Sequence, residues 1–307
     1  MVVPPGFYYG LGSVQLDQVV LHAFHLQADK TKLQAWLDMM FATPSGGAVR
    51  YEVVGSQVFL STAEIGKQYM LDPADRDKGW TSEIDSFLSV PARRENDGLF
   101  AYRLIPIYLF VDSGIALAAG REVWGFPKQL GRFTFDPIQA PPAAARAFAA
   151  DAFVTSPFSP ETQTRWAPIF ELKPLRPVPG SGPIQSIEHF VETILLELGD
   201  EFAFFAAEIA RALGADGLTM SMLRQFPDAA TPTLAAYQGA LEARSVITAL
   251  RAMGLTEDAY RLRITSYDSH PFLTELGIAT DWQDVGRGVW VDYDFRQDLA
   301  TEVWRAG

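Results

Sequence analysis

The feature that most constrains the fold is a succession of short apolar runs, rich in β-branched and aromatic residues, that are separated by turns instead of by helices. Runs of this kind predict strands. They occupy residues 17–27, 49–54, 57–65, 99–111, 147–154, 165–172, 218–226, 260–266 and 288–295. Residues 234–250 are ambiguous, because their Ala, Glu and Arg content also suits a helix. Strands without regular strand-helix alternation form antiparallel sheets or barrels. We therefore predict an α+β fold that is mainly antiparallel β and barrel-like, with added helices.

Helical patterns occur at a few places only. Apolar residues recur at helical spacing within 29–40 and within 186–213. We expect the second region to be a helical insertion near 184–214 in a single domain that spans 1–307. A short terminal helix is also expected at 298–304.

Three local patterns give sharper predictions. Gly55-Ser56, between the runs 49–54 and 57–65, is suited to a tight hairpin turn. Pro106 predicts a bend or bulge in the strand at 99–111. The apolar residues 115–119 are expected to form a further strand, which leads into a lysine-containing segment.

Composition excludes several classes of function. The net charge of -12 argues against a nucleic-acid partner, because phosphate binding requires clustered Lys and Arg. The sequence has no cysteine, which excludes disulfides, thiolate catalysis and zinc-thiolate sites. We expect a cytoplasmic protein, since the first residues do not resemble a signal peptide and no apolar run approaches the ~20 residues that span a bilayer.

Lys128 has an unusual position for a lysine. Residues 115–119 are all apolar, and Val123, Trp124 and Phe126 add apolar bulk next to it. Desolvation disfavours the ammonium form, so we expect a lowered pKa for Lys128 and a Lys128→Met variant at least as stable as the parent. At pH 7 a lysine of pKa ~10.4 is neutral about once in 2,500 molecules, and only the neutral amine attacks a carbonyl. The alternative is a lysine whose stem lies on apolar surface with its amine in water.

The residues around Lys128 resemble the lysine segment of the acetoacetate decarboxylase family. The matching residues are Gly120-Arg121-Glu122 and Gly125-Phe126-Pro127-Lys128. The resemblance implies that Lys128 forms a Schiff base with a ketone. Acetoacetate decarboxylase is itself a known case of an activated lysine, so the idea of activation comes from the family.

Weaker similarities extend along the chain. Thr81-Ser82-Glu83, followed by the apolar run 87–90, is similar to the family segment that supplies an active-site glutamate. Residues 222–232 and 261–271 resemble later family strands and turns. The resemblance implies that Glu83 moves protons near the imine. The alternative is a solvated glutamate beside the charged stretch 72–80. A Glu83→Gln change should leave imine formation intact and slow turnover.

The sequence departs from the family pattern at two places. Family members usually carry a second lysine directly after the first, and this chain has Gln129 there. A neutral amide cannot repel the proton of Lys128, so activation must rest on desolvation. The family also uses an early arginine and a further glutamate; the arginine has no clear equivalent, and Glu64 is a loose candidate for the glutamate.

The candidate substrate-binding residues are Arg121, Gln129 and Trp124. Arg121 presents a planar fork that suits a substrate carboxylate, although a structural role beside Glu122 is the stronger alternative. Trp124 is either a pocket wall or a core residue.

No metal site and no cofactor are expected. His22 and His25 point to opposite faces of a strand, so they do not form a metal pair. The chain has no Gly-rich phosphate loop.

These observations predict a Schiff-base-forming lyase that acts on a keto acid or ketone, most simply by decarboxylation as in acetoacetate decarboxylase. One alternative is a Schiff-base aldolase or dehydratase of the same fold. Another is a non-catalytic barrel that binds an apolar small molecule. The family resemblance also implies a homo-oligomer.

Overall fold

The computed structural model describes residues 12–95, 102–135, 146–179, 183–184, 186–198, 211–212 and 217–307. Its strands are β1 (Val14–Gln27), β2 (Tyr51–Val53), β3 (Gln57–Met70), β4 (Trp80–Arg94), β5 (Tyr102–Val111), β6 (Lys128–Phe135), β7 (Phe148–Val154), β8 (Arg165–Pro177), β9 (Pro183–Ile184), β10 (Leu218–Pro227), β11 (Ala235–Ile264), β12 (Gln283–Gln297) and β13 (Thr301–Arg305). The helices are α1 (Lys30–Leu37), α2 (Gly114–Ala119), α3 (Ile187–Leu198) and α5 (Phe272–Leu276), with short helical turns η1 (Asp38–Ala42), η2 (Arg76–Lys78) and η3 (Gly120–Trp124).

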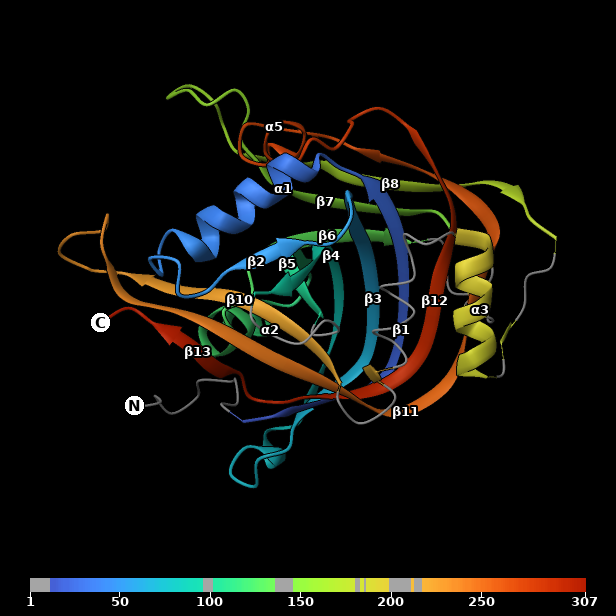
Figure 1. Cartoon of the computed structure of the whole chain (residues 1–307), viewed down its shortest axis with the longest axis horizontal. Coiled ribbons are helices and arrows are strands. Elements are labelled where there is room, and N and C mark those ends of the chain that lie inside the picture. Colours follow the sequence, from blue (N-terminus) through green and yellow to red (C-terminus); the bar gives the residue numbers. More distant parts are fainter. Residues whose placement is uncertain are drawn as a thin grey trace.

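The strands form one large sheet that wraps in a ring (Figure 1). Its order is β10-β5-β6-β7-β8-β11-β12-β1-β3-β4-β2, and further pairings join β10 to β11 and β5 to β4. Most neighbours are antiparallel, whereas β5 pairs in parallel with β6 and with β10. The predicted fold class, mainly antiparallel β with few helices, is confirmed.

Strand β11 joins the parts of the ring. Its 30 residues pair with β8, β9, β10, β12 and β13 in different segments. The ambiguous residues 234–250 and the run predicted at 260–266 are therefore parts of one strand. Register shifts along its pairing with β12 show how a strand of this length can bend.

The strand pairing predicted at Gly55 is wrong. Gly55 has a φ of 77° and the chain turns there, but β2 pairs with the last residues of β4, while β3 pairs with β1 and β4. A turn signal indicates where the chain reverses. It does not say which strands become neighbours, and here β4 extends past β3 and receives β2.

Two predicted elements have a different type. Residues 115–119 belong to helix α2, because Ala and Leu are strong helix formers and the Ser113 side chain caps the helix by accepting a hydrogen bond from Ala116 N. At the C-terminus, the expected helix at 298–304 is wrong, since β13 pairs with β11. Pairing with the long strand outweighs the weak local preference of so short a segment.

Strands β3 and β5 are buried on both faces. In β3, Leu60 packs in the main core, and Ser61 and Ala63 point to the opposite side. The alternation in β5 is interrupted by the bulge predicted at Pro106, where Ser89 of β4 pairs with Pro106 and Leu88 pairs with Tyr108. A sheet that is buried on both faces separates two interior regions, one of which is the main core.

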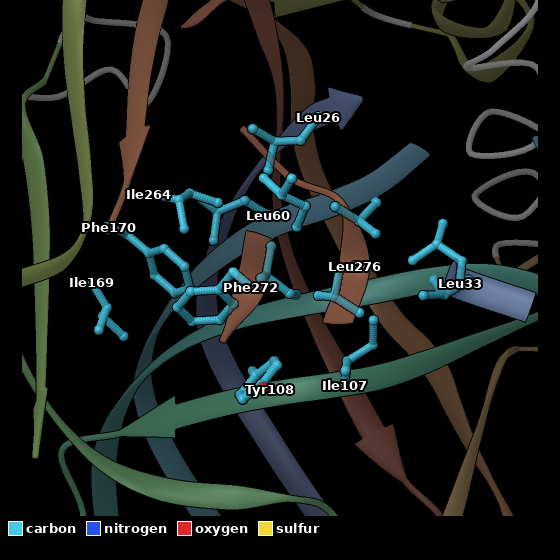
Figure 2. Close-up of a cluster of buried hydrophobic side chains, with 14 of the residues drawn as sticks. Leu26, Leu33, Leu60, Ile107, Tyr108, Ile169, Phe170, Ile264, Phe272 and Leu276 are labelled. Carbon is cyan, nitrogen blue, oxygen red and sulfur yellow. The ribbon is translucent and has the colours of Figure 1, made fainter. Parts of the chain in front are cut away.

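Aromatic and aliphatic side chains fill the main core (Figure 2). Phe272 of α5 is its centre, with ring centroids 4.7 Å from Tyr108 and 5.6 Å from Phe170. Leu33 of α1 and Leu276 of α5 are fully buried, so these two helices close one end of this core.

Helix α3 lies on the outer side of the ring, beside β11 and β12 in Figure 1. It buries Phe190 and Ile194 against Met253, Leu255 and Val289. The helix begins within the insertion expected near 184–214, whose residues 199–210 and 213–216 lie outside the described part. Every helix in the described ranges is too short or too polar to cross a membrane.

Phe170→Ala should lower the free energy of unfolding by about 3 to 5 kcal/mol, because it leaves a cavity in the main core. Urea denaturation followed by tryptophan fluorescence measures this loss. Phe158→Ala is the matched control, since the Phe158 side chain is 66% exposed and its removal should change stability little. Equal stability of the two variants would contradict the packing described here.

Candidate active site

Lys128 is the first residue of β6 and points into the region on the other side of the sheet from the main core. It pairs in register with Leu109 of β5, which pairs in turn with Phe87 of β4. Side chains in one row across a sheet share a face. The pairing of β5 with both neighbours therefore brings Lys128 close to side chains of β4, although β4 and β6 do not pair with each other.

Gly120 makes room for the stem of Lys128. A Cβ atom at position 120 would lie 2.5 Å from Lys128 Cδ, too close for atoms that are not bonded. The stem of Lys128 follows its present path because position 120 has no side chain. Lys128 itself is 8% exposed.

A cavity of about 180 Å³ surrounds the Lys128 side chain. Strands β1, β3, β4, β5, β10, β11 and β12 contribute to it, together with α2 and η3. Its walls are mainly apolar and include Leu16, Ile65, Leu109, Met220, Val291 and Phe295. The cavity is the second interior region of the ring, and it is not filled by side chains.

Glu83 and Asp85 face Lys128 from β4. They are alternate residues of the strand, so both point to the cavity. Lys128 Nζ donates a hydrogen bond to Glu83 Oε1 at 2.5 Å and lies 4.0 Å from Asp85 Oδ1. Glu83 is 2% exposed. This burial rejects the alternative of a solvated glutamate beside the loop at 72–80.

The three groups shift one another's pKa values. Burial acts to lower the pKa of Lys128, but attraction to Asp85 and Glu83 outweighs it and raises the pKa above its ordinary value. Burial acts to raise the pKa of Glu83, but attraction to Lys128 and a hydrogen bond with Asp85 lower it. Burial and repulsion from Glu83 raise the pKa of Asp85 well above its usual range. The pKa values of Lys128 and Asp85 are thus raised, and that of Glu83 is lowered.

The expected lowering of the Lys128 pKa is therefore wrong. The sequence showed the apolar neighbours that remove water, and desolvation does act in that direction. It did not show that two acidic side chains from another strand would lie next to the amine. Opposite charges at this distance favour the charged form and reverse the shift.

Asp85 and Tyr293 are cavity residues that the sequence reasoning missed. Asp85 could have been found, because a residue two positions from Glu83 on a strand shares its face. Tyr293 of β12 lines the same cavity, and burial followed by the charge of Asp85 raises the pKa of its hydroxyl. No local pattern pointed to Tyr293, since its position depends on ring closure.

The candidate substrate-binding residues separate into two groups. Trp124 lines the cavity. Its Nε1 donates a hydrogen bond to Asp298 O at 3.0 Å, which fixes the position of the indole ring. Arg121 is exposed and donates to Lys128 O at 3.1 Å, outside the cavity. Gln129 follows Lys128 on the opposite face of β6, where its Oε1 lies 3.0 Å from His270 Nε2. The structure does not bring Arg121 or Gln129 to the cavity.

Glu64 also lies away from the cavity. It follows Ala63 in β3 and so faces the other side of the strand, where it pairs with Arg146 at 2.7 Å. Within the described ranges, no group of three or more His, Asp or Glu side chains is arranged to hold a metal ion.

Comparison with known proteins finds a family match for part of the chain and a shared fold. Residues 21–153, which include Glu83 and Lys128, match the family model described as acetoacetate decarboxylase (ADC). Over these residues the chain is similar to the acetoacetate decarboxylase family. No curated protein matches the sequence at a significant level.

Several solved structures share the fold over nearly the whole chain. The acetoacetate decarboxylase of Legionella pneumophila subsp. pneumophila str. Philadelphia 1 superposes with a TM-score of 0.62 at 14% identity, covering 99% of this chain and 93% of its own. An acetoacetate decarboxylase-like enzyme from Sphingomonas wittichii RW1 gives 0.61 at 14% identity, with coverage of 100% and 98%. The enduracididine biosynthesis enzyme MppR, solved with pyruvate, gives 0.57 at 12% identity, with coverage of 99% and 92%. At these identities the likeness concerns the fold.

Lys128→Met should lower the free energy of unfolding at pH 7.5 by about 3 to 5 kcal/mol, because it leaves Glu83 buried without its cation. This reverses the stability expected from the sequence. This loss of stability should become smaller toward pH 5. Without Lys128 the pKa of Glu83 is higher, so Glu83 takes up a proton there and is no longer a buried charge. Urea denaturation at both pH values measures the effect.

In the wild-type protein, we expect the free energy of unfolding to fall at high pH because of Lys128 and at low pH because of Glu83. The raised pKa of Lys128 means that its stabilising contribution is lost as the pH rises through that value. The lowered pKa of Glu83 means that its contribution is lost as the pH falls through that value.

Lys30→Met is the matched control for Lys128→Met, since Lys30 is exposed. A Lys128→Met variant as stable as this control at pH 7.5 would contradict the ion pair.

Proposed function

We propose that the protein is a Schiff-base-forming lyase in which Lys128 condenses with the carbonyl carbon of a keto acid or ketone. The observation that carries this proposal is a single buried lysine, bonded at 2.5 Å to a buried glutamate, at the wall of an open apolar cavity. The match of residues 21–153 to the acetoacetate decarboxylase family model supports the same chemistry.

Proton transfer within the pair activates the amine. Lys128 passes one proton to Glu83 along their hydrogen bond, which converts an ammonium and a carboxylate into a neutral amine and a neutral acid. The cavity provides little water to solvate charges, so the neutral form is accessible there despite the raised resting pKa. Activation thus needs no second lysine, which agrees with Gln129 at the next position.

Condensation moves two protons from the nitrogen to the departing oxygen. The amine nitrogen bonds to the carbonyl carbon, and the carbonyl oxygen takes a proton to become a hydroxyl group. A second proton lets this hydroxyl leave as water and gives the iminium. In this proposal Asp85 starts protonated, gives its proton to the oxygen and regains one from the nitrogen once the C–N bond has formed. Glu83 returns the proton that it took from the ammonium to the hydroxyl group, which leaves as water. Both carboxyl groups finish as they began.

Decarboxylation is the first reaction that this iminium supports. When the substrate is a β-keto acid, the bond to its carboxylate breaks, the electron pair moves to the iminium to form an enamine, and carbon dioxide leaves. A proton then adds to the carbon atom, and water releases the ketone. An apolar cavity favours this step, since charge is dispersed as the bond breaks.

Aldol-type cleavage or dehydration is the second candidate. Here the enamine carbon gains or loses an aldehyde, or expels a β-hydroxyl group as water after protonation. The pair of carboxyl groups with opposite pKa shifts favours this reaction, since it needs both an acid and a base. MppR has also been solved with the condensation product of pyruvate and imidazole 4-carboxaldehyde, so a related fold accommodates such a product.

Borohydride trapping tests the Schiff base. Incubation with acetone, followed by sodium cyanoborohydride and mass spectrometry, should add one isopropyl group to the peptide that contains Lys128. Lys128→Arg should give no adduct at this peptide, since a guanidinium does not form an imine, and it keeps the positive charge that Glu83 needs. Labelling spread evenly over other lysines, with none at Lys128, would reject the proposal.

Glu83→Gln should slow turnover by about 10²- to 10⁴-fold, the usual contribution of a positioned proton acceptor. The measurement is deuterium exchange into the α-carbon of acetone, followed by NMR. Prolonged incubation should still give the full borohydride adduct, because Lys128 remains. Glu257→Gln, at an exposed position of β11, is the control. Unchanged exchange in Glu83→Gln would leave Glu83 with a structural role only.

A further inference from the structure

We propose that the natural substrate of this cavity is an uncharged ketone or aldehyde with an apolar chain, and not a free keto acid. The inference rests on the Schiff-base chemistry proposed above and names its substrate class. What carries it is the distribution of charge around the cavity.

Lys128 is the only cation among the cavity-lining residues of the described structure. All 25 Lys and Arg residues of the chain lie within the described ranges, since the remaining segments contain neither type. No lysine or arginine outside the described part is therefore left to supply a second positive charge. A substrate carboxylate would have to share the one cation that forms the imine.

The charge of Lys128 is already balanced. Glu83 pairs with it directly, and Asp85 lies 4.0 Å away. Asp112, which accepts a hydrogen bond from Ile84 N, adds a third acidic group close to the pair. Every ionisable side chain near the amine other than Lys128 is thus an acid or the phenol of Tyr293. A carboxylate that entered would be buried without a partner, which is strongly unfavourable.

Arginines around the ring are held by acids that face away from the cavity. In β12, Val291, Tyr293 and Phe295 line the cavity, and the alternate residues Asp292 and Asp294 bind Arg251 on the outer face at 2.7 and 2.6 Å. Likewise, Arg146 pairs with Glu64 on the core side of β3. The strand alternation that builds the cavity wall therefore directs these guanidinium groups elsewhere.

The size and walls of the cavity agree with an apolar chain. An apolar protein cavity of about 150 Å³ holds benzene, so 180 Å³ has room for a carbonyl group and a chain of similar bulk. The polar lining groups away from the lysine are neutral, namely Ser61, Gln68, Ser245, Tyr293 and Gln297. Ser245 and Gln297 bond to each other at 2.6 Å. The charge and the walls of the cavity therefore favour aldol-type cleavage or dehydration over decarboxylation, because decarboxylation needs a carboxylate on the substrate.

Two matched ketones test the inference. Levulinate and 5-methylhexan-2-one are both methyl ketones with the same chain, and an isopropyl group replaces the carboxylate in the second. Cyanoborohydride trapping at pH 7, followed by mass spectrometry of the Lys128 peptide, gives the concentration of each that labels half of the protein. We expect the neutral ketone to label at a concentration at least about tenfold lower, because it buries no unpaired charge.

Gln68→Arg adds the missing cation to the cavity wall. We expect this variant to bring the levulinate concentration close to that of the neutral ketone, or below it. Gln68→Met, which fills similar space without charge, should keep the wild-type preference. If Gln68→Arg does not fold, the wild-type comparison alone decides.

The outcomes separate this inference from the proposed function. Equal or preferential labelling of Lys128 by levulinate in the wild-type protein overturns the substrate class and leaves the Schiff-base chemistry standing. No adduct with either ketone overturns the Schiff-base proposal, and the inference fails with it. An unchanged preference in Gln68→Arg, with the arginine in place, would show that charge does not set the selectivity and would also overturn the inference.

Discussion

The site depends on one buried contact, the hydrogen-bonded ion pair between Lys128 and Glu83. Its partners come from β6 and β4, which do not pair with each other; β5 lies between them and pairs in parallel with one and antiparallel with the other. Burying either charge alone would be strongly unfavourable, so each residue requires the other. The order and register of three strands are therefore what make a buried amine tolerable here.

Under the Schiff-base proposal, the same contact lets a lysine with a raised pKa serve as a nucleophile. A lysine in an apolar wall without partners would lose its proton to solvent and would need no base. In the proposed reaction Glu83 takes the proton of the amine, and Asp85, whose pKa is raised, lies 4.0 Å away as the second proton-transfer group. Two carboxyl groups with pKa values pushed apart provide an acid and a base beside one nitrogen.

The ring has two interior regions that are filled differently. One side of β3 and β5 carries Leu60, Tyr108 and Phe110 into an aromatic core closed by Phe272. The other side carries Ala63 and Leu109 to a cavity that remains open. Both strands are thus covered on both faces, which accounts for the almost continuous apolar run at 99–111. A well-packed core thus lies beside a cavity that side chains do not fill.

The sequence by itself determined the fold class, most strand positions, the Pro106 bulge and the two residues of the central pair. Turn residues, apolar periodicity and the motif around Lys128 are local signals, and each was read from neighbouring residues. It could not determine that 115–119 is helical, that β2 pairs with β4, or that Gln129 faces His270 away from the cavity. Only the tertiary structure decided the sign of the Lys128 pKa shift, because the acids that raise it come from a strand more than forty residues away. Electrostatic interactions act through space, and their partners are known only once the strands are arranged.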